Sequence, residues 1–220
     1  MAGRVRARLP GIVVALATVV VLVAVAILVF FNPVWVGFEQ GRARADLWTG
    51  WTPPEVRVVT DSVVVEVYLG PGTFAQEMRG EPVFNARERG HMADVRTVWL
   101  VFLALAAFAA IVLVVARARA GDRARYWRAV ASGAIVLAVG TIAVGISFAL
   151  LFDTAFELFH QLFFAQGTYT FDPRSERMVQ LFPYSFWTET SVAIAIVVLG
   201  LAVAAWATAA WLARRAEMSR

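Results

Sequence analysis

The hydrophobic residues of this chain are concentrated in four long blocks, and polar segments separate one block from the next. Each block is almost free of charged residues and reaches the length of about 20 residues that an α-helix needs to cross a membrane. We therefore expect an all-α membrane protein that forms a single integral membrane domain over residues 1–220. The four transmembrane helices are predicted at about residues 11–31, 95–116, 129–152 and 189–213.

The charged residues indicate which side of the membrane each segment occupies. All 20 basic residues are arginines, and eleven of them lie in the short segments before the first block, between the second and third blocks and after the fourth. Because basic short segments stay in the cytoplasm, both termini are expected to be cytoplasmic, and the outer loops are expected at residues 32–94 and 153–188. The eleven arginines are Arg4, Arg6, Arg8, Arg117, Arg119, Arg123, Arg125, Arg128, Arg214, Arg215 and Arg220.

The first block is longer than the core of about 7–15 residues found in cleaved signal peptides, so we expect it to remain as a helix. The four blocks together predict a multi-pass protein of the cytoplasmic (inner) membrane. The third block contains Gly133, Gly140 and Gly145, and small residues of this kind allow transmembrane helices to pack closely.

The first outer loop is long enough to fold on the membrane surface. Residues 52–55 (TPPE) resemble a helix capping box with proline in the first turn. Valines at helical spacing follow, and they predict a helix of about residues 53–69. Thr73 is predicted to cap a second short helix that runs through Met78. The loop should therefore form a small helical extracytoplasmic cap.

The only two histidines fall where this topology brings them to one face of the membrane. His91 lies just before the second block, and His160 lies just after the third. Histidine is suited to proton transfer near neutral pH and to metal ligation. The chain contains no cysteine and no lysine, which excludes disulfides, thiolate chemistry and a catalytic lysine. Two histidines at one depth predict a reaction centre at the outer membrane surface.

Carboxylates accompany both histidines. In a helix, Asp94 would share a face with His91, and Glu157 and Asp153 would share a face with His160. A carboxylate can fix the tautomer of a histidine and raise its basicity. Two alternatives stay open: a polar ring at the interface without chemistry, and a zinc site of two histidines and a carboxylate, for which the usual HExxH spacing is absent.

Several segments around the histidines resemble the motifs of one family. These segments are FNARERGHMADVR at residues 84–96, FHQLFF at 159–164, FDPRSERMVQLFP at 171–183 and the following FW at 186–187. They are similar to the bacterial lipoprotein intramolecular transacylase (Lit) family of four-helix integral membrane proteins. The motifs span about residues 84–187, and the four-helix layout covers the whole chain.

The resemblance implies an acyltransferase whose site faces the extracytoplasmic side and needs neither a metal nor another cofactor. The ester acyl chain at the sn-2 position of a diacylglyceryl-modified lipoprotein would pass to the α-amine of its N-terminal cysteine. The expected partners are such lipoprotein N-termini and membrane lipids, with no nucleic acid. The expected catalytic residues are His91, His160, Asp94 and Glu157, and the expected substrate-binding residues are Arg96, Phe163, Phe164, Tyr169 and Trp187.

Two other functions remain compatible with the residues alone. The chain could be a non-enzymatic membrane sensor or assembly protein whose cap binds a partner, with the histidines acting as a pH switch or as helix caps. It could also be a zinc-dependent membrane hydrolase. Substitution of both histidines would separate the first of these from the transacylase, and sensitivity to a chelator would separate the second.

Overall fold

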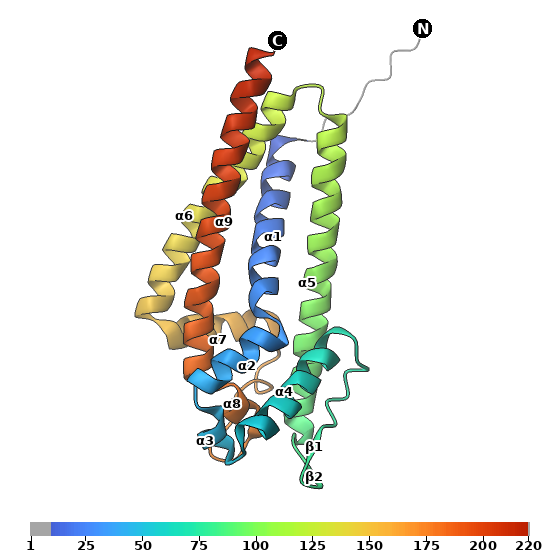
Figure 1. The fold of residues 1–220 in the computed structure, drawn as a ribbon, viewed down its shortest axis with the longest axis vertical. Coiled ribbons are helices and arrows are strands. Elements are labelled where there is room, and N and C mark those ends of the chain that lie inside the picture. The colour runs from blue at the N-terminus through green and yellow to red at the C-terminus, as the bar shows by residue number, and fades with distance from the viewer. Residues whose placement is uncertain (1–9, 220) are drawn as a thin grey trace. The chain divides into compact units, whose positions relative to one another are not determined.

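The computed structural model describes residues 10–219 (Figure 1). Arg4, Arg6, Arg8 and Arg220, which contribute to the predicted orientation, lie outside the described residues. The chain is divided into two compact units, here called the first and the second unit. The first comprises the residues up to Ala26, Phe102–Ile146 and the residues from Ala195 onward, and the second comprises Ile27–Val101 and Ser147–Ile194.

Four helices of the described chain are long and apolar enough to cross a membrane, which confirms the predicted four-helix membrane fold. Their charged residues are confined to the ends, where the polar segments of the sequence begin. Two of them extend well beyond the apolar blocks, so that α5 already includes His91. The four are α1 (Gly11–Phe30), α5 (Ala86–Arg119), α6 (Arg123–Leu150) and α9 (Tyr184–Met218).

Close packing in the first unit depends on one glycine of α6. A Cβ atom on Gly133 would lie 2.4 Å from the backbone oxygen of Ala15 in α1, a distance that no side chain can occupy. Gly140 has no such neighbour within 4 Å, and neither has Gly145. The expectation that small residues allow helices to approach is therefore met at Gly133 and at neither of the other two glycines.

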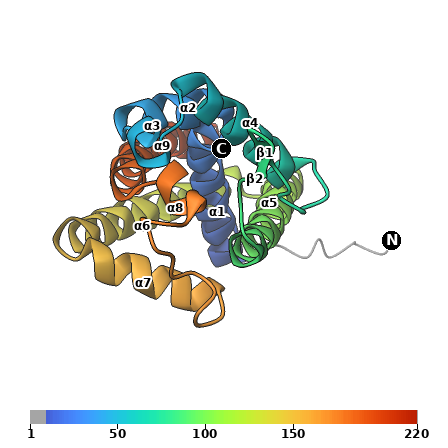
Figure 2. The ribbon, with the colours of Figure 1, turned by 90° about the horizontal axis from the view of Figure 1, so that it is seen from below.

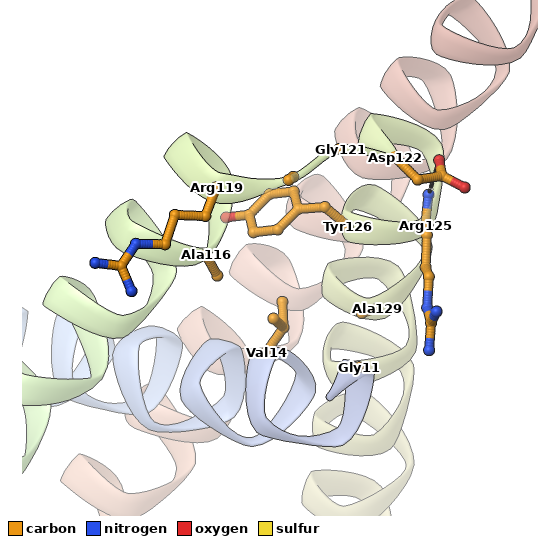
Figure 3. A pocket seen from close by; sticks show the side chains of 10 residues that line it. Gly11, Val14, Ala116, Arg119, Gly121, Asp122, Arg125, Tyr126 and Ala129 are labelled. Carbon is orange, nitrogen blue, oxygen red and sulfur yellow. Dashed lines mark hydrogen bonds between the residues drawn. The ribbon is translucent and has the colours of Figure 1, made fainter. Parts of the chain in front are cut away.

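A small pocket of the first unit lies where α1, the end of α5 and the start of α6 meet (Figure 3). Its volume is about 50 Å³, and its lining is mostly apolar. The side chains of Arg119 and Arg125 extend away from each other in Figure 3. The hydroxyl of Tyr126 donates to the carbonyl of Leu113 at 3.3 Å. The pocket suits a few water molecules rather than a lipid headgroup.

The second unit contains the helical cap predicted for the first outer loop, in blue to teal in Figure 1. The predicted helix of residues 53–69 is confirmed as α4, in which the backbone N–H of Thr52 donates to the Glu55 carboxylate at 2.8 Å. The valines at helical spacing form its buried face. The cap helices are α2 (Pro33–Arg42), α3 (Ala45–Thr49) and α4 (Pro53–Tyr68).

The second short helix predicted from Thr73 to Met78 is wrong. The backbone N–H and the hydroxyl of Thr73 both donate to the Glu66 carboxylate, so the hydroxyl does not cap a helix. Phe74 follows with φ of 47° and a fully buried side chain. A two-stranded antiparallel hairpin then forms from β1 (Glu77–Met78) and β2 (Glu81–Pro82).

Apolar and polar contacts join the cap to residues 164–183, the segment that precedes α9, and to the start of α9. Val36, Val64 and Phe186 are buried together in one apolar cluster. The side-chain amide of Gln40 is buried and donates to the Thr60 hydroxyl and to the carbonyl of Leu181. Helix α8 (Arg177–Leu181) lies beside α3 (Figure 1, Figure 2). The cap therefore supports the loop that carries the aromatic motifs.

One residue separates α6 from α7 (Phe152–Phe163). Leu151 has φ of −140° and ψ of 45°, values outside the α-helical region, so the polar stripe of Asp153, Glu157 and His160 belongs to a helix of its own. The ring of Phe152 contacts Tyr184 at the start of α9, with centroids 4.9 Å apart. Helix α7 is too short to span a membrane.

Candidate functional site

The two histidines lie side by side in the second unit, as the sequence predicts. The imidazole of His91 comes from α5 and that of His160 from α7, with centroids 6.0 Å apart and planes inclined by 22°. Both side chains are buried, with 6% and 8% of their surface exposed. The pair is therefore a shared, largely water-excluded site.

A backbone contact fixes the tautomer of His160. Its Nδ1 atom lies 2.7 Å from the carbonyl oxygen of Phe156, one turn earlier in α7. Because a carbonyl only accepts hydrogen bonds, Nδ1 must carry the proton and donate it. The Nε2 atom of the neutral ring then has a free lone pair. Burial lowers the pKa of His160 from its usual value of 6.5, so the neutral form predominates at pH 7.

Aromatic rings enclose the pair. Phe164, the residue after α7, contacts both imidazoles, at centroid distances of 4.8 Å from His91 and 5.5 Å from His160. Phe171 lies 5.4 Å from His91, and Tyr169 lies 5.1 Å from His160. These rings come from the loop between α7 and α8, so this loop contributes directly to the walls of the site.

Glu157 acts on His160 through Tyr169. The carboxylate accepts a hydrogen bond of 2.8 Å from the Tyr169 hydroxyl and one of 2.9 Å from the amide of Gln161. These two hydrogen bonds lower the pKa of Glu157, with the Tyr169 hydroxyl as the larger cause. The Glu157 carboxylate therefore holds the Tyr169 ring against His160 and adds a negative charge near that imidazole.

Asp94 is on α5 with His91, but its side chain is exposed. Among residues 10–219, no hydrogen bond joins Asp94 to His91. The Nδ1 atom of His91 is buried and has no hydrogen-bond partner in this part of the chain. Asp94 can therefore influence His91 only by its charge in this structure.

Three expected substrate-binding residues lie away from the histidine rings. The guanidinium of Arg96 donates to the carbonyls of Glu66 and Gly70, at 3.2 and 2.8 Å, and thereby caps the end of α4. Phe163 packs against Phe159, and Trp187 packs against the ring of Phe186. Only Phe164 and Tyr169 of the expected binding residues contact the histidine pair.

Two buried carboxylates that the sequence analysis did not single out join the motifs around the site. Glu88 accepts the backbone N–H groups of Asn85 at 2.8 Å and of Met178 at 2.7 Å. It thereby attaches the start of α5 to the start of α8. The spacing of Asn85 and Glu88, three residues apart at a helix start, is the signal that could have identified Glu88 as a capping residue.

Glu176 forms the second junction. It accepts hydrogen bonds from the Arg87 guanidinium at 2.6 and 2.7 Å and from the backbone N–H of Asp172 at 2.6 Å. The same guanidinium lies 4.9 Å from the centre of the Phe171 ring, a cation–π distance. Arg87 and Glu176 therefore hold Phe171 against His91. The only signal in the sequence for these two residues is that they lie in the family-like segments at residues 84–96 and 171–183.

The side chains that could bind a metal ion are not clustered in the described part of the chain. Within residues 10–219, no group of three histidine, cysteine or carboxylate side chains is arranged to hold a metal ion. The histidine pair instead has a backbone carbonyl, aromatic rings and a tyrosine-bound carboxylate as neighbours. Such surroundings suit proton transfer in a site with little water.

Comparisons with known proteins give a family match and a fold match. The family model described as lipoprotein intramolecular transacylase Lit matches residues 11–187. A solved structure of the membrane integral lipoprotein intramolecular transacylase Lit from Bacillus cereus has the same fold, with a TM-score of 0.80 and 19% sequence identity. The alignment covers 94% of this chain and 96% of that one. No curated protein matches the sequence significantly.

Two further structures of the Bacillus cereus protein carry a histidine substitution. The form with histidine replaced by arginine has a TM-score of 0.67 at 20% identity, and the alignment covers 96% of this chain and 93% of that one. The form with histidine replaced by alanine has a TM-score of 0.66 at 21% identity, with 94% of each chain covered. At these identities the likeness establishes the fold.

Proposed function

Because the chain belongs to the lipoprotein intramolecular transacylase (Lit) family, we propose that it moves one acyl chain within a diacylglyceryl-modified lipoprotein. The protein is an acyltransferase and a multi-pass membrane protein. In the proposed reaction, the ester acyl chain at the sn-2 position of the glyceryl group passes to the α-amine of the N-terminal cysteine. The product is a lyso-form lipoprotein with an amide-linked chain.

The single observation that carries this proposal is the buried imidazole pair, with the tautomer of His160 fixed by Phe156. The α-ammonium group first releases one proton to water, and acyl transfer then needs a base, because the neutral amine must lose a further proton as its nitrogen bonds to the carbonyl carbon. It then needs an acid, because the departing glyceryl oxygen must receive a proton. One neutral histidine can serve in both steps, and such catalysis contributes typically about 10²–10⁴-fold.

His160 suits the role of the base. Its Nε2 takes a proton from the amine as the new C–N bond forms. The same nitrogen returns the proton to the glyceryl oxygen as the C–O bond of the ester breaks. No oxidant, reductant or covalent enzyme intermediate is needed, because amine and ester belong to one molecule and their proximity lowers the entropic cost of reaction.

His91 suits the role of the partner. An N–H of its ring can donate to the negative oxygen of the tetrahedral intermediate or orient the amine. The low-polarity walls of Phe164 and Phe171 strengthen such a hydrogen bond, because they exclude water. Tyr169 and Glu157 position His160, and Asp94 contributes charge beside His91.

The proposed site faces the extracytoplasmic side of the cytoplasmic membrane, with both termini in the cytoplasm. The unequal distribution of arginine supports this orientation. Lipoprotein N-termini are anchored by their acyl chains, so a site at the membrane surface meets the glyceryl esters directly. Phe163 and Trp187, both partly exposed beside the loop, are proposed to contact the acyl chains. Arg96 is proposed to shape the cap through α4.

Mass spectrometry of lipoprotein N-terminal peptides tests the proposal. The protein is produced in a bacterial host that lacks N-acylation of lipoproteins, as wild type, His91→Ala or His160→Ala. Thr154→Ala, an exposed polar position of α7, is the matched control. We expect N-acylated lyso-form peptides with the wild type and the control, and unchanged diacylglyceryl peptides with either histidine variant.

Three results would contradict the proposal. Unchanged diacylglyceryl peptides with well-expressed wild type would favour a sensor or assembly protein. Normal conversion by both histidine variants would separate the activity from the histidine pair. If conversion occurs but is lost on chelation and restored by zinc, the metal-free mechanism is wrong.

A further inference from the structure

Helix α7 is divided lengthwise into a polar half and an apolar half. With 3.6 residues per turn, side chains three and four positions apart share a face. The polar half contains His160 and the side chains that support it, whereas the opposite half is apolar. The apolar half presents four large exposed side chains, namely Leu158, Phe159, Leu162 and Phe163.

The apolar face has few partners in the described chain, whereas Glu157 and His160 on the polar side are held by hydrogen bonds. Glu157 binds Tyr169 and Gln161, and His160 is buried among rings. By contrast, Leu162 is 76% exposed. A run of large exposed apolar side chains on one side of a helix marks a surface that water does not normally cover.

The position of α7 in the chain indicates what covers this face. Only Leu151 separates it from α6, a helix that spans the membrane, so α7 begins at a membrane boundary. Its first ring, Phe152, contacts Tyr184 at the start of the spanning helix α9. At 12 residues, α7 is too short to cross the bilayer.

We propose that α7 is an interfacial helix whose Leu158, Phe159, Leu162 and Phe163 face is inserted into the hydrocarbon edge of the leaflet in which α6 ends. Amphipathic helices of this kind lie in the membrane plane, with the apolar face buried about 5–10 Å deep. The occupant of the exposed face is bilayer lipid rather than a second copy of the chain or a soluble protein.

The charge of α7 distinguishes it from most interfacial helices. Its polar face carries Asp153 and Glu157 and has neither lysine nor arginine. It therefore gains nothing from anionic headgroups, and its insertion depends on the apolar side chains alone. If the acyl transfer is as proposed, this insertion holds His160 at the depth of the ester groups of a membrane-anchored substrate.

The absence of cysteine from the chain makes the proposal testable without a substituted background. Leu162→Cys, in the full-length protein, is labelled with a nitroxide and reconstituted into phosphatidylcholine vesicles. Collision with oxygen, which concentrates in hydrocarbon, is compared with collision with a nickel chelate, which stays in water. The controls are Thr154→Cys on the polar half of α7, Leu69→Cys in the cap, which is 85% exposed, and Val139→Cys in α6, which is 62% exposed.

We expect the label at Leu162 to match that at Val139, with high oxygen and low nickel accessibility. The label at Thr154 should resemble the one at Leu69. Nickel accessibility at Leu162 equal to that at Leu69 would overturn the proposal, because the face would then lie in water. Spin–spin broadening at Leu162 that disappears on dilution with unlabelled protein would also overturn it, since a second copy would then cover the face.

A second comparison tests the charge argument. Addition of phosphatidylglycerol to the vesicles should leave the accessibility at Leu162 unchanged. If the label enters hydrocarbon only when anionic lipid is present, insertion by apolar side chains alone is wrong. Neither comparison measures acyl transfer, so failure here is distinct from failure of the proposed function.

Discussion

Glu88 accepts the backbone N–H of Met178 at 2.7 Å and thereby connects the start of α5, which carries His91, to the segment that carries Phe171. The carboxylate is almost completely buried and accepts the N–H of Asn85 as well. One side chain therefore fixes two motifs that are about 90 residues apart in the sequence. The aromatic wall of the site depends on this connection.

Replacement of Glu88 should destabilise the second unit. Glu88→Ala leaves two N–H groups without their acceptor, and each buried unsatisfied group costs about 1–3 kcal/mol. Glu88→Gln keeps one acceptor oxygen and should cost less. Thermal unfolding in detergent checks the order, with Glu81→Ala on the exposed hairpin as control. Equal stability of Glu88→Ala and Glu81→Ala would contradict the connecting role.

Acyl transfer should depend on pH through His160. Its pKa is lowered by burial, so the neutral base is lost only as the pH falls through a pKa below 6.5. The substrate amine, whose pKa is about 8, must also be neutral, so the rate should fall gradually below about pH 8 and more steeply, along an acid limb, as the pH passes the pKa of His160. Initial rates of lyso-form production across pH check this shape.

Glu157→Gln should move that acid limb in a defined direction. The negative charge of Glu157 raises the pKa of His160, so its removal should lower that pKa further. The steeper decrease in rate should then begin at a lower pH than in the wild type. A shift to higher pH would mean that Glu157 does not act electrostatically on His160. If the acid limb is unchanged and only the maximal rate is lower, Glu157 acts on the reaction only through its contact with Tyr169.

Gly133 and Gly140 offer a matched pair in α6. Gly133→Ala places a Cβ against the backbone of Ala15 and should force α1 and α6 apart, at a cost of about 1–3 kcal/mol. Gly140→Ala meets no neighbour and should be neutral or slightly stabilising, because alanine favours helix. Thermal unfolding of the two variants in detergent checks this difference. Equal effects would contradict the close approach at Gly133.

Arg96 should act on stability rather than on the chemical step. Arg96→Met removes the hydrogen bonds to the carbonyls of Glu66 and Gly70 at the end of α4. We expect a lower unfolding temperature and an almost unchanged rate constant for the folded protein. A normal unfolding temperature with a strongly raised KM would instead support the substrate contact expected from the sequence.

The membrane helices and the histidine pair could be predicted from sequence because they depend on local signals. Long apolar blocks determine the spans, and the arginine distribution indicated one face for both histidines. The capping box at residues 52–55 correctly located the start of α4. These features need no knowledge of which segments meet in space.

Features that depend on long-range contacts could not be read in the same way. Thr73 looked like a helix cap, but the Glu66 carboxylate from the preceding helix took its donors. Glu88 and Glu176 were not singled out from the sequence, because only the fold buries them. Arg96 belongs to a histidine motif, yet its partners are carbonyls from another helix. Glu66 lies seven residues before Thr73, and the partners in the other cases are more distant in sequence.

The central claim is that the histidine pair transfers the sn-2 chain within one molecule. The most direct measurement uses purified protein and a synthetic diacylglyceryl lipopeptide with a deuterated sn-2 chain, mixed with an unlabelled lipopeptide of different peptide mass. The account predicts deuterium only in the amide of the first peptide, and no product with His160→Ala. Exchange of label between peptides, an unlabelled amide chain on the first peptide, or normal turnover by His160→Ala would contradict it.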